Sequence, residues 1–412
     1  MKVFRRIVSY SASVVLMTVI NVAVIPTVII LAGTTAWAGI AVAQSVASFT
    51  GVIVAFGWGV TGPSEVAGLP QERRGQFFAD SMASRLWLFI LGTPAMAIVV
   101  STTAPGNSIA NILAAFALLL PALGASWFFV GEKSPWRLFF LENIPRATGT
   151  LIGTVVLFAS GDIALFAAAQ VVGAVICVLI SWLNVSKRYP GFAWHGGIRS
   201  SLQRLRAQTA GVVTAGTSAL YVNLPLVIVA LFFPSATAPY AMADKLMKFV
   251  LSGYSPAVQI AQGYVPQSDS HRHRNRASLA AIVAGGMGLV MGLGYAIFAP
   301  QAVGLLSSDQ VQITWAISIP LGLALAAIAT SAIVGLACLT SLGALRQVAT
   351  STVLGAVVGI PLLLAAGVFS DPSGIAWATA LSEIAVAVYQ VIHFRRILPN
   401  IEFTLGKTES VR

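Results

Sequence analysis

Charged residues are scarce in this sequence. Asp, Glu, Lys and Arg together make up only 9% of its 412 residues, whereas they make up roughly 25% of an ordinary soluble protein. A water-soluble surface cannot be built from so few. Hydrophobic residues account for 57%, and they form runs long enough for the helices of about 20 residues that cross a bilayer. The composition therefore predicts an all-α membrane protein.

Cysteine and the usual metal-binding patterns are also nearly absent. Cys177 and Cys338 fall inside apolar runs far apart in the sequence, which excludes a disulfide framework, and we interpret them as small hydrophobic residues. No Cys/His/Asp cluster has the spacing of a zinc site, and no glycine-rich nucleotide-binding pattern occurs. We therefore predict no metal, no cofactor and no bound ATP. The four histidines, interpreted as interfacial, are His195, His271, His273 and His393.

The apolar runs predict about twelve transmembrane helices. We place them near residues 8–32, 36–59, 84–104, 108–131, 145–160, 162–184, 209–233, 237–263, 278–300, 310–338, 348–369 and 373–394. The connections on one side are short and carry only acidic charges, and the two longest connections on the other side are 60–83 and 185–208. No loop is large enough for a catalytic domain, and we predict no catalytic residue.

The basic residues predict the orientation in the membrane. With the N-terminus in the cytoplasm, 22 of the 24 Lys and Arg residues fall in internal loops or their flanks, as expected for cytoplasmic segments. The formal charge of +11 is thus a topology signal, and we expect no nucleic-acid partner. Both termini are predicted to be cytoplasmic, in a multi-pass plasma-membrane protein. The two remaining cations, Lys245 and Lys248, fall inside the eighth predicted helix.

An internal repeat relates the two halves of the chain. The segment starting at Ala36 aligns with the one starting at Ala236, and Pro26 in the first predicted helix corresponds to Pro225 in the seventh. Because each half has six crossings, both repeats have the same orientation, related by an axis along the membrane normal. The repeat predicts two six-helix lobes, residues 1–204 and 205–412, around a central cavity.

The eighth predicted helix carries a polar stripe. At about 100° per residue, its polar side chains share one arc, and each ion at the bilayer centre would cost roughly 2.5–3.5 kcal/mol if it faced lipid. One interpretation is a structural ion pair between Asp244 and Lys248, which are four residues apart. The other is that Lys245, as a further cation, binds an anionic ligand such as pyrophosphate. Both remain open from the sequence.

The repeat adds polar positions in the second predicted helix and an acidic one in the twelfth. A shift of 200 residues maps the charged stripe onto uncharged polar residues, which we expect to face it across the cavity. Glu383 is a candidate for ion coupling, and its alternative role is a neutral acid bonded to neighbouring helices. The predicted substrate-binding residues are Asp244, Lys245, Lys248, Ser252, Gln259, Gln44, Ser45 and Ser48.

Two short segments resemble a known family. The segment 127–133, with Trp127, Gly131 and Glu132, resembles a Trp, Gly, Glu pattern in polysaccharide and O-antigen flippases. The segment 240–245, followed by Pro266, resembles their Tyr, Ala, Lys pattern. These proteins belong to the multidrug, oligosaccharidyl-lipid and polysaccharide exporter superfamily. The likeness in hydropathy and in the twelve-helix plan covers essentially the whole chain.

The resemblance implies a transporter with alternating access and not an enzyme. Its substrate would be an undecaprenyl-pyrophosphate-linked oligosaccharide, flipped from the cytoplasmic to the outer leaflet for polysaccharide biosynthesis. The implied partners are this lipid-linked saccharide, membrane lipids, a proton or sodium gradient and glycan-assembly enzymes.

Three other classes compete with this interpretation. Export of drugs or other small solutes is the main alternative. A major facilitator protein would show a Gly, Asp, Arg pattern between helices 2 and 3, but the loop here reads GLPQERRGQF, without the Asp. A membrane glycosyltransferase would need acidic residues in a sizeable external loop.

Overall fold

The computed structural model describes residues 2–189, 192–194, 197–207, 209–266 and 270–398. Every regular element in these ranges is a helix. Eight of the described helical runs are long and apolar enough to cross a membrane. The prediction of an all-α protein with several membrane-spanning segments is confirmed. His195, Lys407 and Arg412, which counted in the sequence-based predictions, lie outside the described residues.

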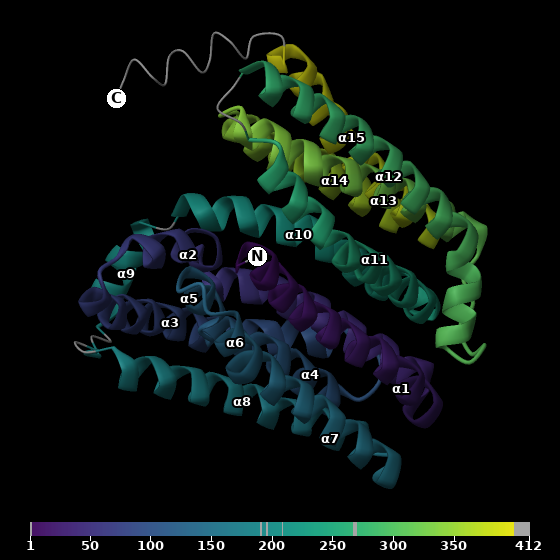
Figure 1. The fold of residues 1–412 in the computed structure, drawn as a ribbon. Coiled ribbons are helices and arrows are strands. Elements are labelled where there is room, and N and C mark those ends of the chain that lie inside the picture. Colours follow the sequence, from purple (N-terminus) through teal and green to yellow (C-terminus); the bar gives the residue numbers. More distant parts are fainter. Residues whose placement is uncertain (1, 190–191, 195–196, 208, 267–269, 399–412) are drawn as a thin grey trace. The chain divides into compact units, whose positions relative to one another are not determined.

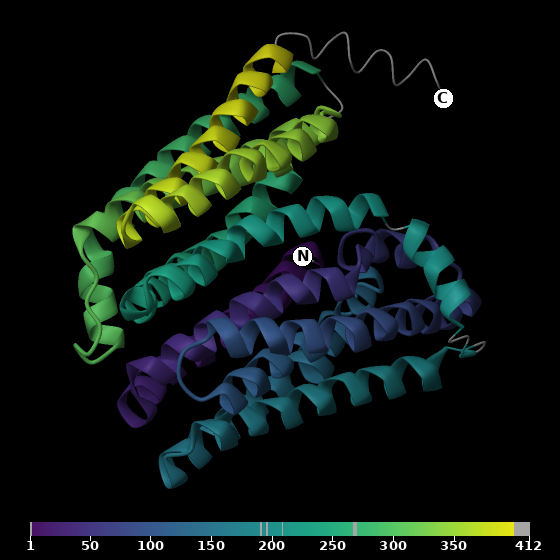
Figure 2. The same cartoon turned by 180° about the vertical axis from the view of Figure 1, so that it is seen from behind.

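Two compact units make up the chain. One comprises Met1–Leu231 with Leu306–Gln310, and the other comprises Phe232–Leu305 with Val311–Arg412. Each is a bundle of long helices, and in the second unit α15 packs against both α13 and α14; Figure 2 shows α14 and α15 side by side. The lobes 1–204 and 205–412, which the repeat defines, remain a prediction.

The helices of the first unit are coloured purple to teal in Figure 1. Their bounds are α1 Lys2–Ala55, α2 Trp58–Gly68, α3 Gln71–Thr103, α4 Ser108–Leu119, η1 Leu120–Leu123, α5 Ser126–Gly131, α6 Pro135–Arg137, η2 Leu138–Asn143, α7 Ile144–Ser160, α8 Ile163–Arg188, α9 Ile198–Ala207 and α10 Thr209–Phe232. In the second unit they are η3 Pro234–Ala236, α11 Thr237–Tyr264, α12 Ser270–Leu306, α13 Trp315–Ile333, η4 Val334–Leu339, α14 Leu345–Phe369 and α15 Pro372–Ile397.

A single glycine replaces the loop expected between the first two helices. Helical structure continues through α1, and only Gly33 leaves it, with φ 87° and ψ 165°. Glycine adopts positive φ without steric penalty, so one residue suffices to interrupt the helix. The predicted segment 8–32 and most of the segment 36–59 are therefore two parts of α1, and the connection between them is shorter than expected.

The predicted internal loop 60–83 is wrong. This stretch forms α2 and the first part of α3. Arg85, which counted as a loop flank in the orientation argument, is only 1% exposed. Its guanidinium donates to Ser81 Oγ at 3.1 Å and to the carbonyls of Ala122 and Gly124 at 2.8 and 2.9 Å. Arg85 is thus an internal structural cation, and apolar composition alone could not show where α3 begins.

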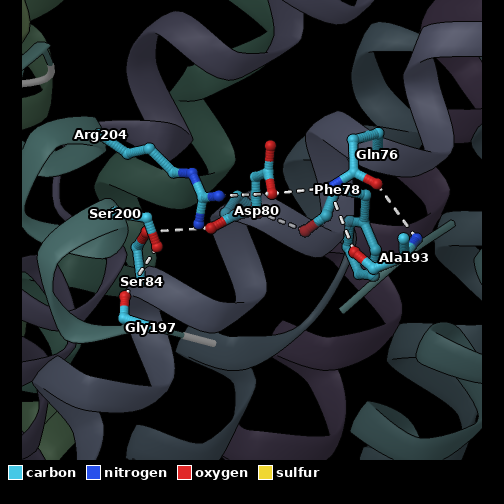
Figure 3. Close-up of polar contacts among 9 residues, drawn as sticks. Gln76, Phe78, Asp80, Ser84, Ala193, Gly197, Ser200 and Arg204 are labelled. Carbon is cyan, nitrogen blue, oxygen red and sulfur yellow. Dashed lines mark hydrogen bonds and ion pairs between the residues drawn. The ribbon is translucent and has the colours of Figure 1, made fainter. Parts of the chain in front are cut away.

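The segment after α8 folds back onto α3, as Figure 3 shows. Arg204 of α9 forms an ion pair with Asp80 of α3 at 2.9 Å, and Gln76 donates to the same carboxylate at 2.7 Å. The Gln76 amide also bonds the backbone of Ala193 in both directions, each at 3.1 Å. The predicted loop 185–208 therefore contains a helix that is held against the first unit.

Matching turns occur in the two halves of the chain. After α5, the Ser134 N–H donates to the Phe129 carbonyl at 3.0 Å, and after η4 the Ala344 N–H donates to the Leu339 carbonyl at 2.9 Å. Each turn has the hydrogen bonds of a Schellman motif, with a left-handed residue just before its last donor. Both turns follow the predicted fourth crossing of their half, which supports the internal repeat.

Candidate functional site

The second unit aligns three helices in the same direction. The Tyr254 hydroxyl of α11 donates to the Ala329 carbonyl of α13 at 3.2 Å, and Gln390 of α15 lies against Gly335 of η4. α12 runs opposite to α11 and α13, since near its end Tyr295 reaches the start of α11 and the Ala296 carbonyl accepts from Ser318 at the start of α13. α11 and α15 run in the same direction, because Tyr240 lies next to Thr379 in their first parts and Ala261 and Phe394 near their ends share one hydrophobic cluster. Positions along α11 and α15 can therefore be compared turn by turn.

The predicted ion pair of α11 is present. Lys248 Nζ lies 2.7 Å from Asp244 Oδ2, and the side chains are 31% and 10% exposed. Two tyrosines lie around the carboxylate: Tyr240 is one turn earlier on the same helix, and the Tyr295 hydroxyl donates to the Ala243 carbonyl at 2.7 Å. The pair thus lies on a part of α11 that packs against the rest of the unit.

Lys245 lies beside this pair. Its side chain is half-buried, and its charge interacts with those of Lys248 and Asp244. Two lysines and one aspartate therefore occupy a little over one turn of an otherwise apolar stretch. Since lipid solvates ions poorly, such a group is expected to face protein or a watery space.

Glu383 on α15 lies at about the same height along the helices as Asp244 on α11. Tyr240 of α11 lies next to Thr379 of α15. Because the two helices run in the same direction, one further turn along each leads from Tyr240 to Asp244 and from Thr379 to Glu383. Asp244 and Glu383 are 7% and 5% exposed, whereas both lysines retain more exposure. Two candidates from distant parts of the sequence thus lie at a similar level of the second unit.

The polar residues near Glu383 on α15 make defined contacts. Ser382 donates to the Gly355 carbonyl of α14 at 2.8 Å, and Gln390 donates to Ser351 Oγ at 2.8 Å. Thr379 donates within its own helix, to the Ile375 carbonyl at 3.0 Å. These contacts hold α15 against α14 and fix the face on which Glu383 lies.

The rest of the predicted stripe on α11 differs from its charged part. Ser252 donates to the Lys248 carbonyl at 2.9 Å, and Ser255 donates to the Ser252 carbonyl at 2.8 Å. Both hydroxyls thus bond their own helix. Gln259 and Gln262 are exposed. The stripe is therefore not uniform: only the part around the lysines is enclosed among other helices.

The candidates in the first unit lie on α1. Ser45 is 5% exposed, Gln44 is half-buried, and Ser48 donates to the Gln44 carbonyl at 2.7 Å. Their expected position opposite the charged part of α11 remains a prediction.

Two buried residues escaped prediction from the sequence, one at the site in the second unit and one in the first unit. Tyr295 lies on α12, and only its tertiary position shows that it belongs with Asp244. Glu142 is 2% exposed in the first unit, where it accepts from the Ala125 N–H at 2.7 Å and from the Cys177 thiol at 3.1 Å. The sequence signal that could have identified Glu142 was a single acidic residue in an apolar stretch.

Among the described residues no group of three or more His, Cys, Asp or Glu is arranged to hold a metal ion.

Comparison with known proteins identifies the fold. No family model and no curated protein matches the sequence. An inward-facing multidrug resistance MATE family transporter of the MOP superfamily matches with a TM-score of 0.65 at 11% identity, over 96% of both chains. The lipid II flippase MurJ, in an inward closed conformation, matches with a TM-score of 0.65 at 13% identity, over 98% of this chain and 92% of MurJ.

A third match is a MOP superfamily transporter from Pyrococcus furiosus, described as having a binding pocket of reverse polarity. It has a TM-score of 0.53 at 13% identity and covers 96% of both chains. At these identities the likeness concerns the fold and not the function. The chain is thus a multi-pass membrane protein with the fold of the MOP superfamily, to which the multidrug and lipid-flipping transporters above also conform.

Proposed function

We propose that this protein is a flippase that moves an undecaprenyl-pyrophosphate-linked oligosaccharide from the cytoplasmic to the outer leaflet of the plasma membrane, for polysaccharide biosynthesis. The fold supports a transporter, because the matching structures are transporters. The likeness to a protein whose stated cargo is lipid II supports a lipid-linked cargo. The two short sequence segments that resemble polysaccharide flippases favour the saccharide.

The observation that carries the proposal is the arrangement of charge in α11. Asp244 and Glu383 are buried, whereas Lys245 and Lys248 are more exposed. A ligand that approaches this cluster meets the Lys248 ammonium group before the Asp244 carboxylate, because their side chains are 31% and 10% exposed, and Lys245 adds a second positive charge beside them. Lysine acts as a point charge for phosphate groups. The cluster therefore suits the pyrophosphate linker of such a cargo.

In the proposed mechanism, twelve crossings form two lobes that open the cavity alternately to the cytoplasm and to the outside. The lysines receive the pyrophosphate, and the polar side chains hydrogen-bond the sugar hydroxyls. Glu383 is the coupling candidate for a proton or sodium gradient. The polar set comprises Gln44, Ser45, Ser48, Ser252 and Gln259.

Ion-coupled export of drugs or small solutes is the second candidate. It is favoured by the equal TM-score of the multidrug transporter and by the buried carboxylates Asp244 and Glu383, which would suit a cationic solute.

Purified protein in proteoliposomes separates the two candidates. We expect translocation of a polyprenyl-pyrophosphate-linked saccharide and no accumulation of a cationic dye. Dye transport without saccharide translocation would overturn the flippase proposal.

A further inference from the structure

Basic side chains from four segments meet at one end of the first unit. Glu132, at the end of α5, has a side chain that is only 4% exposed, and Arg137 Nη1 lies 3.0 Å from its Oε2. The Tyr189 hydroxyl, just after α8, donates to the same carboxylate. The Arg188 guanidinium lies 5.9 Å from the Tyr189 ring centroid. Glu132 is therefore the centre of a cluster formed by the ends of α5, α6 and α8.

Arg74 brings a fourth segment to this cluster. Its Nε donates to the Leu69 carbonyl at 3.0 Å, which holds the side chain at the turn between α2 and α3. Burial raises the pKa of Glu132, and the nearby charges of Arg188 and Arg74 act in the opposite direction. Lys133, next in sequence, is exposed. Three arginines thus interact with one buried carboxylate, and exposed Lys133 follows it in the sequence, which leaves an excess of positive charge.

The backbone of Lys133 sets it apart from its repeat counterpart. Lys133 has φ 58°, a left-handed conformation that is unfavourable for any residue with a Cβ atom. In the matching turn of the second half this position is Gly343, with φ 74°, and glycine is the usual residue there. A lysine in place of glycine costs conformational energy, and such strain is found at functional positions. The turn itself does not require a lysine at position 133, so the strain points to a functional contact of the Lys133 side chain.

Exposed aromatic rings flank the cluster. Trp136 and Phe140 are 56% and 57% exposed, and their rings stack with centroids 6.0 Å apart. Aromatic side chains of this kind concentrate at the level of lipid headgroups in membrane proteins. The charge-based orientation also puts this end of the first unit at the cytoplasmic face. Cations beside exposed aromatic rings are thus expected at the depth where the phosphate groups of inner-leaflet lipids lie.

We propose that Arg74, Lys133, Arg137 and Arg188 form a binding site for the phosphate group of a lipid headgroup in the inner leaflet. Glu132 positions the site by holding Arg137 and Tyr189, while Trp136 and Phe140 contact the adjoining acyl region. The site lies within the first unit and is separate from the lysines of α11. It does not depend on the cargo proposed above.

Native mass spectrometry of the purified protein tests this site. The probes are phosphatidylglycerol, a polyprenyl pyrophosphate and zwitterionic phosphatidylcholine, each added to delipidated protein in detergent. We expect retention of both anionic lipids over phosphatidylcholine. Since a charge-assisted hydrogen bond is stronger than a neutral one, the triple variant K133G/R137Q/R188Q should retain at least about tenfold less of them. Gln is chosen because it removes the charge of each arginine and keeps a polar side chain.

Two further variants keep the test independent of folding. Lys133→Gly relieves the left-handed strain, so it should unfold at or above the wild-type temperature and still bind the anionic lipids more weakly. Arg346→Gln removes an exposed cation from the other repeat and should leave binding unchanged. Wild-type binding by the triple variant, or equal loss in Arg346→Gln, would overturn the site.

The two anionic probes identify the source of the phosphate. Equal retention would assign the site to bulk phospholipid. Retention of the pyrophosphate about tenfold above phosphatidylglycerol would assign it to loading of a lipid-linked cargo. Because Lys245 lies in the other unit, a failed transport test of that residue would leave this result unaffected.

Discussion

Arg85 and Glu142 form hydrogen bonds with backbone groups on opposite sides of the same helix interruption. Between α4 and α5 the chain passes through η1, and the Arg85 guanidinium donates to the carbonyls of Ala122 and Gly124. On the other side of the break, Glu142 accepts from the Ala125 N–H at 2.7 Å. Backbone groups freed by a break must find partners in an apolar interior. The Arg85 guanidinium is therefore the donor for the carbonyls freed by the break, and the Glu142 carboxyl group is the acceptor for the freed N–H.

This arrangement predicts that Arg85→Ala destabilises the protein. The substitution leaves two buried carbonyls without their charged donor, and each such bond contributes about 1.5–3 kcal/mol, so we expect a loss of about 3 kcal/mol or more. Glu142→Gln should cost less, because an amide oxygen can still accept from Ala125. The measurement is unfolding in detergent, with exposed Arg346→Ala as the control. Equal stability of the Arg85 and Arg346 variants would contradict the capping role.

The position of this break shows where sequence reasoning stops. Pro121 and Gly124 lie at the interruption, but Pro94, Pro225 and Pro361 lie inside uninterrupted helices. A proline in an apolar run therefore does not identify a break by itself. What distinguishes the α4–α5 run is the pair of charged partners from α3 and η2, and these come together only through tertiary packing.

The candidate site shows the same limit. The Asp244–Lys248 pair could be predicted because both residues lie on one helix, where residues four apart are neighbours. The shared level of Asp244 and Glu383 depends on the packing of α11 and α15, which no local spacing encodes. The composition likewise predicted the spanning helices, but not that polar residues 71–83 continue α3.

The contact between α9 and α3 predicts a local effect of Asp80→Ala. The substitution removes the ion pair with Arg204 and the hydrogen bond from Gln76 (Figure 3). Because these side chains are partly exposed, the global stability should change by only about 1 kcal/mol or less. Amide hydrogen exchange in α9 should nevertheless become faster, because its attachment to α3 is weakened. Unchanged exchange in α9 would show that other contacts hold this helix.

Cysteine labelling tests the predicted orientation. With Cys177 and Cys338 replaced by alanine, a cysteine at exposed Gln310 or Ser160 should react with an impermeant thiol reagent in intact cells. A cysteine at exposed Gln71 or His271 should react only after the membrane is opened. Ser307 is fully buried and would not report on either side. The opposite labelling pattern would reverse the orientation inferred from the basic residues.

The ion pair of α11 predicts a difference between single and double variants. If Asp244 and Lys248 only support each other, then Asp244→Ala or Lys248→Ala leaves one enclosed charge without its partner, whereas the double variant removes both charges. The double variant should then transport better than either single one. Transport by the double variant that is no better than the worse single variant would point to direct contact with the cargo.

Substitution of Lys245, beside this pair, best distinguishes a structural cluster from a ligand-binding one. Lys245→Ala removes a charge that is costly in a membrane interior, so folding and membrane insertion should be preserved. Export should nevertheless be lost, because the cation that meets the pyrophosphate is gone. Lys245→Arg should retain part of the activity, since it keeps the charge and changes its shape.

The readout for Lys245 is the rate of lipid-linked saccharide translocation in proteoliposomes at matched protein amounts. Gln262→Ala on the same helix is the control, because Gln262 is exposed, carries no charge and is not among the proposed cargo contacts. A loss greater than tenfold in Lys245→Ala, with a smaller effect in Gln262→Ala, fits a contact with cargo charge. Near-normal transport by Lys245→Ala would instead make Lys245 a residue that extends its ammonium group toward water, and the anion-binding role of the cluster would then be wrong.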